Sequence, residues 1–201
     1  MNPTKIPWCD FTWNPVVGCT KCSPACERCY AEAGHTKRHL AYMEGKLKAL
    51  PQYAKPFGVI QCLPDRLDEP LRRRKPARIF CGSGTDLFHK DVPDEFRDQI
   101  FGRVIATPRH TFIVLTKRQE NMRRYFDFAT DNRMDAIGEA CRQCTAGECD
   151  GVELDPPLPN LWLGVSVWDQ PSADAAWESL RDTPAAVRCF SYEPALGPVD
   201  F

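Results

Sequence analysis

The stretch TFIVLT, residues 111–116, indicates the class of fold. Four consecutive apolar residues between two threonines are typical of a strand that is buried on both faces, as the strands of parallel sheets are. Similar runs occur at residues 12–17 (interrupted by Pro15), 78–83, 161–167 and 186–191. Helix-length segments separate these runs. The alternation predicts βαβ units around a parallel sheet, of either the barrel or the doubly wound type.

Helices are expected at residues 31–50, 91–106, 118–126 and 173–180. The second is the clearest, because Pro93 suits a first helical turn, Asp94 and Glu95 suit the positive end of a helix, and the apolar residues that follow have helical spacing. Two stretches break the alternation. Residues 58–76, which are rich in charge and proline, are expected to form a loop, and residues 138–159 an insertion between the third and fourth units.

The composition is that of an ordinary globular protein, and 201 residues suffice for one domain with a core. Hydrophobic residues make up 43% of the chain, and the formal net charge of -1 at pH 7 predicts neither a nucleic-acid partner nor an anionic membrane surface. No run approaches the roughly 20 apolar residues of a membrane span, and the N-terminus lacks the apolar core of a signal peptide. We therefore expect a cytoplasmic protein. In that reducing compartment, 11 cysteines favour metal binding over a disulfide framework.

Four of the cysteines lie within the stretch GCTKCSPACERCYAE, residues 18–32. Cys22, Cys26 and Cys29 have the spacing C-x3-C-x2-C, whereas Cys19, Cys26 and Cys29 have the spacing C-x6-C-x2-C. The stretch also contains two C-x2-C pairs, but only three residues separate them, which is too short for the two knuckles of a zinc ribbon. An iron–sulfur cluster is larger than one ion and accepts ligands from a single loop. The spacing therefore favours a cluster over zinc.

A second cysteine group, Cys141, Cys144 and Cys149, lies in the expected insertion with the spacing C-x2-C-x4-C. Three thiols without an obvious fourth ligand leave two interpretations open. They form a second metal site that takes a ligand from elsewhere, or they are incidental thiols of an exposed segment.

Polar residues follow each expected strand. In parallel α/β folds the carboxyl ends of the strands meet at one edge, where chemistry collects. These ends carry an acid and a histidine (Asp86 and His89), a Lys117–Arg118 pair, and further polar residues, among them Ser83, Ser166 and Glu193. Each residue has an ordinary structural explanation, such as capping a turn. For the Lys117–Arg118 pair that explanation is a solvated helix start, but positive charge at the start of a helix is unfavourable, and such local conflicts occur most often at functional sites.

Five segments carry a resemblance to a known family: residues 12–32 (TWNPVVGCTKCSPACERCYAE), 66–96 (RLDEPLRRRKPARIFCGSGTDLFHKDVPDEF), 110–118 (HTFIVLTKR), 158–167 (LPNLWLGVSV) and 191–200 (SYEPALGPVD). On these motifs the protein resembles the phage-associated three-Cys-motif family, and the resemblance extends over nearly the whole chain except the cysteine-bearing insertion. That family is of unknown function and is itself similar to divergent radical S-adenosylmethionine (radical SAM) enzymes.

The resemblance implies an α/β fold, namely a partial (β/α) barrel of the radical SAM type with about five βα units. Residues 1–201 would form a single domain with the insertion at 138–159. The family usually continues past the position of Phe201 with a further strand, a glycine-rich turn and a helix, so a C-terminal part of the family domain is expected to be absent. The chain would then be a natural short form, a fragment, or a chain that a protein partner completes.

The resemblance also implies an activity. The family's usual spacing falls on Cys19, Cys26 and Cys29, whereas Cys22 departs from the family and recreates the radical SAM spacing. A 4Fe–4S cluster would sit on Cys19 or Cys22 together with Cys26 and Cys29, and its open iron would chelate S-adenosylmethionine to modify an unknown substrate, a nucleotide or nucleic acid on the ground of the phage association. The pocket would be lined by Ser83, Asp86, Lys117, Ser166 and Glu193. The alternative is a non-catalytic, cysteine-rich interaction module that holds zinc or an inert cluster.

Overall fold

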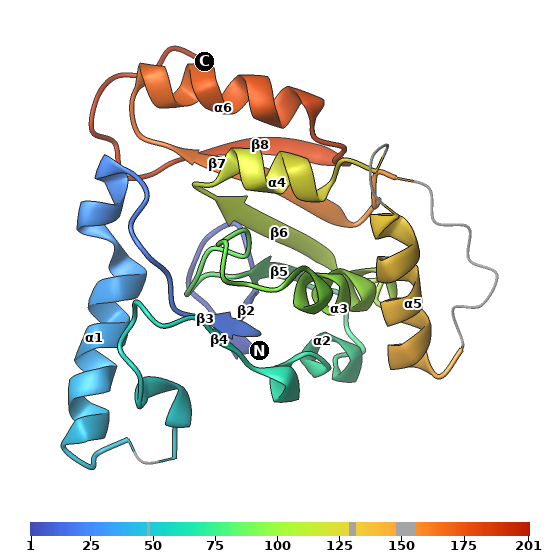
Figure 1. Ribbon diagram of the computed structural model, residues 1–201, viewed down its shortest axis with the longest axis horizontal. Helices are drawn as coiled ribbons and strands as arrows, with labels where there is room; N and C mark the ends of the chain where they lie inside the picture. The colour runs from blue at the N-terminus through green and yellow to red at the C-terminus, as the bar shows by residue number, and fades with distance from the viewer. Residues whose placement is uncertain (48, 129–131, 148–155) are drawn as a thin grey trace.

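The computed structural model describes residues 1–47, 49–128, 132–147 and 156–201. Within these residues the fold is mixed α/β, built on a six-stranded sheet in the order β1-β2-β5-β6-β7-β8 (Figure 1). The strands of this sheet are β1 (Asn2–Pro3), β2 (Phe11–Trp13), β5 (Arg78–Cys81), β6 (Thr111–Thr116), β7 (Leu161–Val167) and β8 (Val187–Tyr192). Strand β1 is antiparallel to β2, and all other neighbours are parallel. A mostly parallel sheet is thus confirmed.

The parallel strands follow one another in space in the same order as in the chain. This order is that of a singly wound sheet, since a doubly wound sheet reverses direction at a switch point. The described strands form an open sheet with β1 and β8 at its edges, so they do not close a barrel. A small second sheet pairs β3 (Val16–Val17) with β4 (Gln61–Cys62) in antiparallel fashion.

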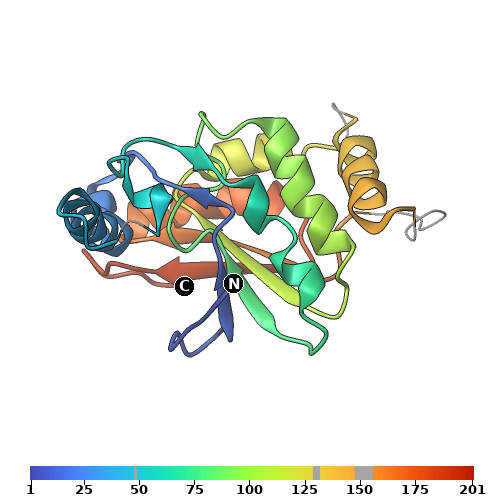
Figure 2. The same ribbon diagram turned by 90° about the horizontal axis from the view of Figure 1, so that it is seen from below.

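The helices that follow the strands cover one face of the sheet, as the view from below shows (Figure 2). They are α3 (Asp94–Ile105), α4 (Gln119–Tyr125) and α6 (Gln170–Asp182), and α5 (Arg133–Thr145) packs on the outside of α3. Of two further helices, α1 (Tyr30–Met43) stands at one side of the molecule, and the short α2 (Glu69–Arg72) contacts α3 (Figure 1). None of the described helices has the length and apolar character needed to cross a membrane.

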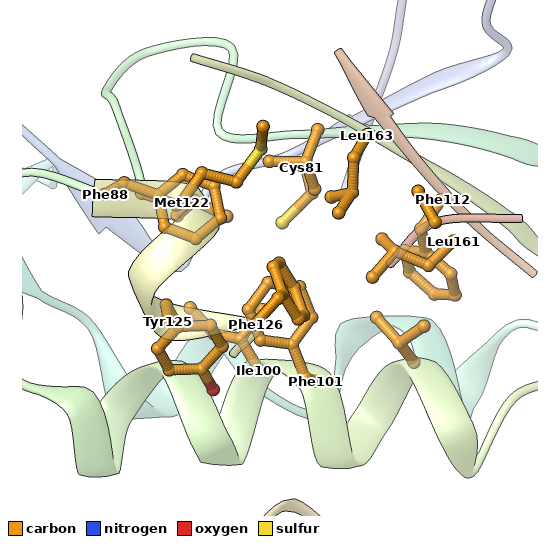
Figure 3. Close-up of a cluster of buried hydrophobic side chains, with 14 of the residues drawn as sticks. Cys81, Phe88, Ile100, Phe101, Phe112, Met122, Tyr125, Phe126, Leu161 and Leu163 are labelled. Carbon is orange, nitrogen blue, oxygen red and sulfur yellow. The ribbon is translucent and has the colours of Figure 1, made fainter. Parts of the chain in front are cut away.

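The main core lies between the sheet and α3 and α4, where aromatic rings from both helices meet side chains of β5, β6 and β7 (Figure 3). Phe101 and Phe126 have ring centroids 5.1 Å apart in an edge-on arrangement that aromatic pairs favour. On the opposite face of the sheet a smaller cluster contains Cys9, Phe80 and Ile113, and Trp8 of the N-terminal segment contacts Phe80 at 4.9 Å between ring centroids. The two faces therefore differ: one is sealed by helices, and the other faces a short N-terminal segment.

The expected strands at 111–116 and 161–167 coincide with β6 and β7, and β5 and β8 lie within one or two residues of their expected ranges. The expected strand at 12–17 is wrong in one respect. Pro15 separates β2 from β3, and the two pair in different sheets. A proline lacks the N–H that a continuous ladder requires.

The expected helix at 31–50 ends at Met43, and Gly45 follows it with a left-handed φ of 79°. Within 58–76, expected as a loop, the chain forms β4, a 3-10 turn (Pro64–Arg66) and α2. The first part of the 138–159 stretch is helical, because α5 extends to Thr145 and carries Cys141 and Cys144. Residue Cys149 of the same group lies outside the described residues.

Candidate metal centre

The cysteine loop, residues 18–29, begins where β3 ends. Its first residue, Gly18, is held by the segment that follows β5. Gly18 has φ 98° and forms a bridge with Thr85, whose hydroxyl donates to the Gly18 carbonyl at 2.5 Å. A Cβ on Gly18 would lie 2.3 Å from the carbonyl oxygen of Val59, so only glycine fits this crossing. The amide of Cys19 then donates to the Phe57 carbonyl at 2.9 Å. The loop is therefore held between the end of β5 and the segment before β4.

Two of the remaining cysteines, Cys26 and Cys29, follow on consecutive helical segments. Cys26 lies on a 3-10 helix, Pro24–Arg28, and Cys29 is the N-cap residue of α1. The Cys29 Sγ accepts the amide of Glu32 at 3.5 Å, as side chains at N-cap positions do. The first turn of α1 thus points the Glu32 N–H toward this sulfur, an arrangement that suits a negatively charged thiolate.

The Cys22 and Cys26 sulfurs lie 3.9 Å apart and share a hydrogen bond. This bond lowers the pKa of Cys26 to about 4 and raises the pKa of Cys22. Burial raises the pKa of the Cys19 thiol, and the Asp86 carboxylate acts in the same direction, whereas Arg118 opposes both. Cys26 is therefore the member of the Cys22–Cys26 pair that carries negative charge, the form in which thiols bind metals.

Three of the four thiols open into one cavity of about 610 Å³ at the carboxyl ends of the parallel strands. Cys19, Cys26 and Cys29 line this cavity, while the exposed Cys22 is not among its lining residues. All five polar residues expected in a pocket line it as well: Ser83, Asp86, Lys117, Ser166 and Glu193. The structure therefore brings the polar strand ends and three cysteines to a single place.

Asp86 is a buried carboxylate that joins the end of β5 to the end of β6. Its Oδ1 accepts from the Thr116 hydroxyl at 2.7 Å and the Phe88 amide at 3.0 Å. Its Oδ2 accepts from the Lys117 amide at 3.0 Å and from Arg118 at 3.3 Å. Four donors surround this carboxylate, which holds it in one orientation at the cavity wall.

Arg118 links Asp86 to the cysteine loop. Its Nη1 lies 3.6 Å from the Cys19 Sγ, and its Nη2 donates to the Thr20 carbonyl at 2.7 Å. Arg118 is the N-cap residue of α4, where positive charge is unfavourable by itself. The Asp86 carboxylate supplies the compensating charge, which accounts for the conflict seen in the sequence.

The expected acid–histidine pair of Asp86 and His89 does not form through the two side chains. His89 Nδ1 accepts the Asp91 amide at 3.1 Å, so its Nε2 carries the proton and donates to the Thr20 hydroxyl at 2.7 Å. His89 is buried, and burial lowers its pKa. The histidine therefore supports the cysteine loop from outside the cavity as a neutral ring.

The other polar residues reach the cavity from different strands. Ser166 on β7 pairs in register with Ser191 on β8, so both side chains lie on the face opposite the helices. The Ser83 hydroxyl bonds the side chain of Asn14, whose Oδ1 also accepts the Gly84 amide at 2.8 Å. Asn14 was not among the expected residues, although an Asn–Pro dipeptide is a turn signal.

The apolar wall of the cavity was not expected from the sequence. It includes Trp8, Tyr30, Phe57, Phe80 and Leu115. The Tyr30 hydroxyl donates to the Ser83 carbonyl at 2.7 Å, which places the start of α1 against the end of β5. Trp8 and Phe57 come from irregular segments, and no periodicity or motif marks them.

The arrangement combines soft thiol donors with a cavity that is apolar on one side and polar on the other. In the described part of the chain, no three side chains of His, Cys, Asp or Glu already stand close enough around one point to hold a single metal ion. The two described members of the second cysteine group, Cys141 and Cys144, do not line this cavity: they lie on α5, and the Cys144 thiol donates to the Cys141 carbonyl at 3.2 Å.

Comparisons with known proteins agree with the family expectation at a general level. No curated protein and no solved structure gives a significant match to the chain. One family model, described as "Protein of unknown function (DUF5131)", matches residues 3–201. Because the match spans nearly the whole sequence, the chain belongs to the DUF5131 family of proteins of unknown function.

Proposed function

We propose that this protein is an iron–sulfur enzyme of the radical SAM type, with Cys19, Cys26 and Cys29 as the cluster ligands. The observation that carries the proposal is the single cavity lined by these three thiols and by polar residues from the carboxyl ends of β5, β6, β7 and β8. Active sites of parallel α/β folds lie at this edge of the sheet. The singly wound order of the strands suits a partial barrel of the radical SAM type.

The donor set fits a 4Fe–4S cluster. Cysteine thiolates are the ligands of such clusters, and the cavity presents three of them. Three protein ligands leave one iron of a four-iron cluster open. When bound, the cluster would supply the electron for reductive cleavage of S-adenosylmethionine, chemistry that belongs to the cofactor.

The chain's own residues have binding and positioning roles in this proposal. Lys117 and Glu193 offer opposite charges at the cavity wall, which suits a ligand that carries both an amine and a carboxylate. Trp8 and Phe80 offer aromatic surface for a planar ring, and together with Leu115 they keep this side of the cavity apolar. Ser83 and Ser166 add hydroxyl groups at the ends of two further strands. Asp86 accepts hydrogen bonds from four protein donors. Its role is therefore to stabilise the cavity wall, and not to bind the ligand.

The first test is the iron and sulfide content of protein prepared without oxygen. We expect about four irons and four sulfides per chain, as a 4Fe–4S cluster requires. Cys19→Ala, Cys26→Ala and Cys29→Ala should each lose the cluster, whereas Cys22→Ala should retain it. Cys62→Ala is the matched control, because Cys62 lies on β4 and does not line the cavity. Zinc without iron would support the non-catalytic module instead.

The second test is the release of 5′-deoxyadenosine from S-adenosylmethionine by the reduced protein. We expect product from the wild type and from Cys22→Ala, and none from Cys26→Ala. A protein with a complete cluster that releases no 5′-deoxyadenosine would contradict the enzymatic part of the proposal. The substrate class, a nucleotide or nucleic acid, would be examined next by adding these compounds and following their modification by mass spectrometry.

A further inference from the structure

We infer that the Arg118–Asp86 ion pair sets the reduction potential of the cluster by acting on the sulfur of Cys19. The inference rests on the proposed function, because it concerns the same cluster. Arg118 and Asp86 are thereby positioning residues, with opposite electrostatic effects on one ligand. Neither is assigned contact with a substrate.

Two contacts join Asp86, Arg118 and Cys19 in a chain. Asp86 Oδ2 lies 3.3 Å from Arg118 Nη1, and the same nitrogen lies 3.6 Å from Cys19 Sγ. The other terminal nitrogen, Nη2, is occupied by the carbonyl and hydroxyl oxygens of Thr20 at 2.7 and 3.3 Å. These bonds leave the guanidinium little freedom to turn away from the sulfur.

The pair is buried enough to act at short range. The side chains of Arg118 and Asp86 are 12% and 8% exposed, so water screens their charges poorly. Asp86 is in turn held by Thr116 and by the backbone amides of Phe88 and Lys117. The position of the guanidinium is therefore determined by the ends of β5 and β6 and not by the cysteine loop alone.

Reduction adds one negative charge to a cluster and its thiolates. An N–H group and a positive charge beside a ligand sulfur stabilise the reduced state and raise the potential. A carboxylate at the next position weakens this effect. Arg118 and Asp86 are thus expected to shift the potential in opposite directions, which a purely structural role does not predict.

The test uses Arg118→Gln and Asp86→Asn in the protein of residues 1–201, reconstituted with iron and sulfide. The potential is measured by electron paramagnetic resonance of samples poised at known potentials. We expect Arg118→Gln to lower the potential and Asp86→Asn to raise it, each by at least a tenfold change in the reduction equilibrium, which for one electron equals 59 mV. Arg118→Lys keeps the charge and should lie between Arg118→Gln and the wild type.

The control is Arg123→Gln, which makes the same chemical change on an exposed arginine of α4 paired with Glu120. Its potential should equal that of the wild type. If Asp86→Asn does not fold, the inference is still tested by the reduction potentials of the other proteins, which should rise from Arg118→Gln through Arg118→Lys to the wild type. Unchanged potentials in a protein with full iron content, or shifts of the same sign in both variants, would overturn this inference and leave the proposed function standing. A wild-type protein without iron would overturn the proposed function itself.

Discussion

His110 lies buried immediately before β6, in a setting that admits only the neutral ring. Its Nε2 donates toward the carbonyl oxygens of Pro70 and Arg73 at 3.2 and 3.1 Å, while its Nδ1 has no hydrogen-bond partner among the described residues. Burial lowers the pKa of His110 from its ordinary value of 6.5. A proton on Nδ1 would place an unsolvated charge in the core, so protonation favours the unfolded chain.

The resulting prediction concerns the pH dependence of stability. The unfolded chain binds the proton near pH 6.5 and the folded chain only at lower pH, so the contribution of His110 is complete above pH 6.5 and is lost as the pH falls below it. We expect the free energy of unfolding, measured with urea, to fall between about pH 7.5 and pH 5.5. His110→Gln should reduce this slope but not abolish it, because burial lowers the pKa of His89 in the same direction. An unchanged slope would contradict the assignment.

Among the residues of the site, Asp86 is the one whose removal should lower the free energy of unfolding most. Asp86→Ala leaves the buried guanidinium of Arg118 without its partner and also removes the acceptor for Thr116 and two amides. Breaking a buried pair from one side costs about 3–5 kcal/mol of unfolding free energy. Asp182→Ala is the matched control, since Asp182 pairs with Arg181 at the surface and should have little effect. Chemical denaturation of both variants tests the difference.

At the scale of elements, the contact between α3 and α5 depends on a glycine. A Cβ on Gly102 would lie 2.8 Å from backbone and side-chain atoms of Ala140 and from the amide of Cys141. Backbone atoms of a packed helix cannot move aside, so Gly102→Ala should destabilise the protein by about 1–3 kcal/mol. Gly34 on α1 is the matched control, because its nearest neighbour is the flexible end of Arg38 at 3.1 Å. Gly34→Ala should stabilise the protein by up to about 1 kcal/mol, because alanine has the higher helix propensity. Thermal unfolding should therefore show a lower melting temperature for Gly102→Ala and an unchanged or higher one for Gly34→Ala.

Which elements the sequence predicts correctly depends on how deeply they are buried. Strands β6 and β7 have the expected bounds. A strand made of a continuous apolar run must be buried on both faces, and only a sheet that is covered on both sides provides this. The helix expected at 31–50 is too long because α1 buries only His35 among its residues, so tertiary contacts do not extend it beyond Met43. The helical start of the 138–159 stretch is not predicted, because cysteine spacing and prolines, and not periodicity, distinguish that segment in the sequence.

The candidate site was predictable to the extent that it follows from strand ends. Ser166 lies near the end of one apolar run and Asp86 lies in the loop that follows another, and parallel strands bring their ends together whatever the loops do. The sequence does not predict the bond between Arg118 and Cys19. Its only sign in the sequence is the unfavourable positive charge at the expected start of a helix. Trp8 and Phe57 line the cavity from irregular segments whose position depends on contacts distant in sequence, so no local pattern marks them.

At the scale of the whole molecule, stability is unevenly distributed. Strands β6 and β7 are internal strands of the sheet and contribute Phe112, Leu163 and other fully buried side chains to the main core. Helix α1, by contrast, leaves Leu40 and Met43 exposed and lies at the side of the sheet (Figure 1). Elements with few buried apolar contacts open locally, without unfolding of the rest.

Hydrogen exchange should therefore separate two regions of the metal-free protein. We expect the amides of β6 and β7 to exchange only through global unfolding, and those of α1 to exchange faster through local opening. Reconstitution with iron and sulfide should slow exchange in residues 18–32, because a cluster would tie Cys19, Cys26 and Cys29 together and fix the first turn of α1. Strand β7 should not change in the same experiment, and Cys26→Ala should show no slowing at 18–32. Equal protection of α1 and β7 before reconstitution would contradict the uneven distribution, and equal exchange at 18–32 before and after it would contradict cluster binding by this loop.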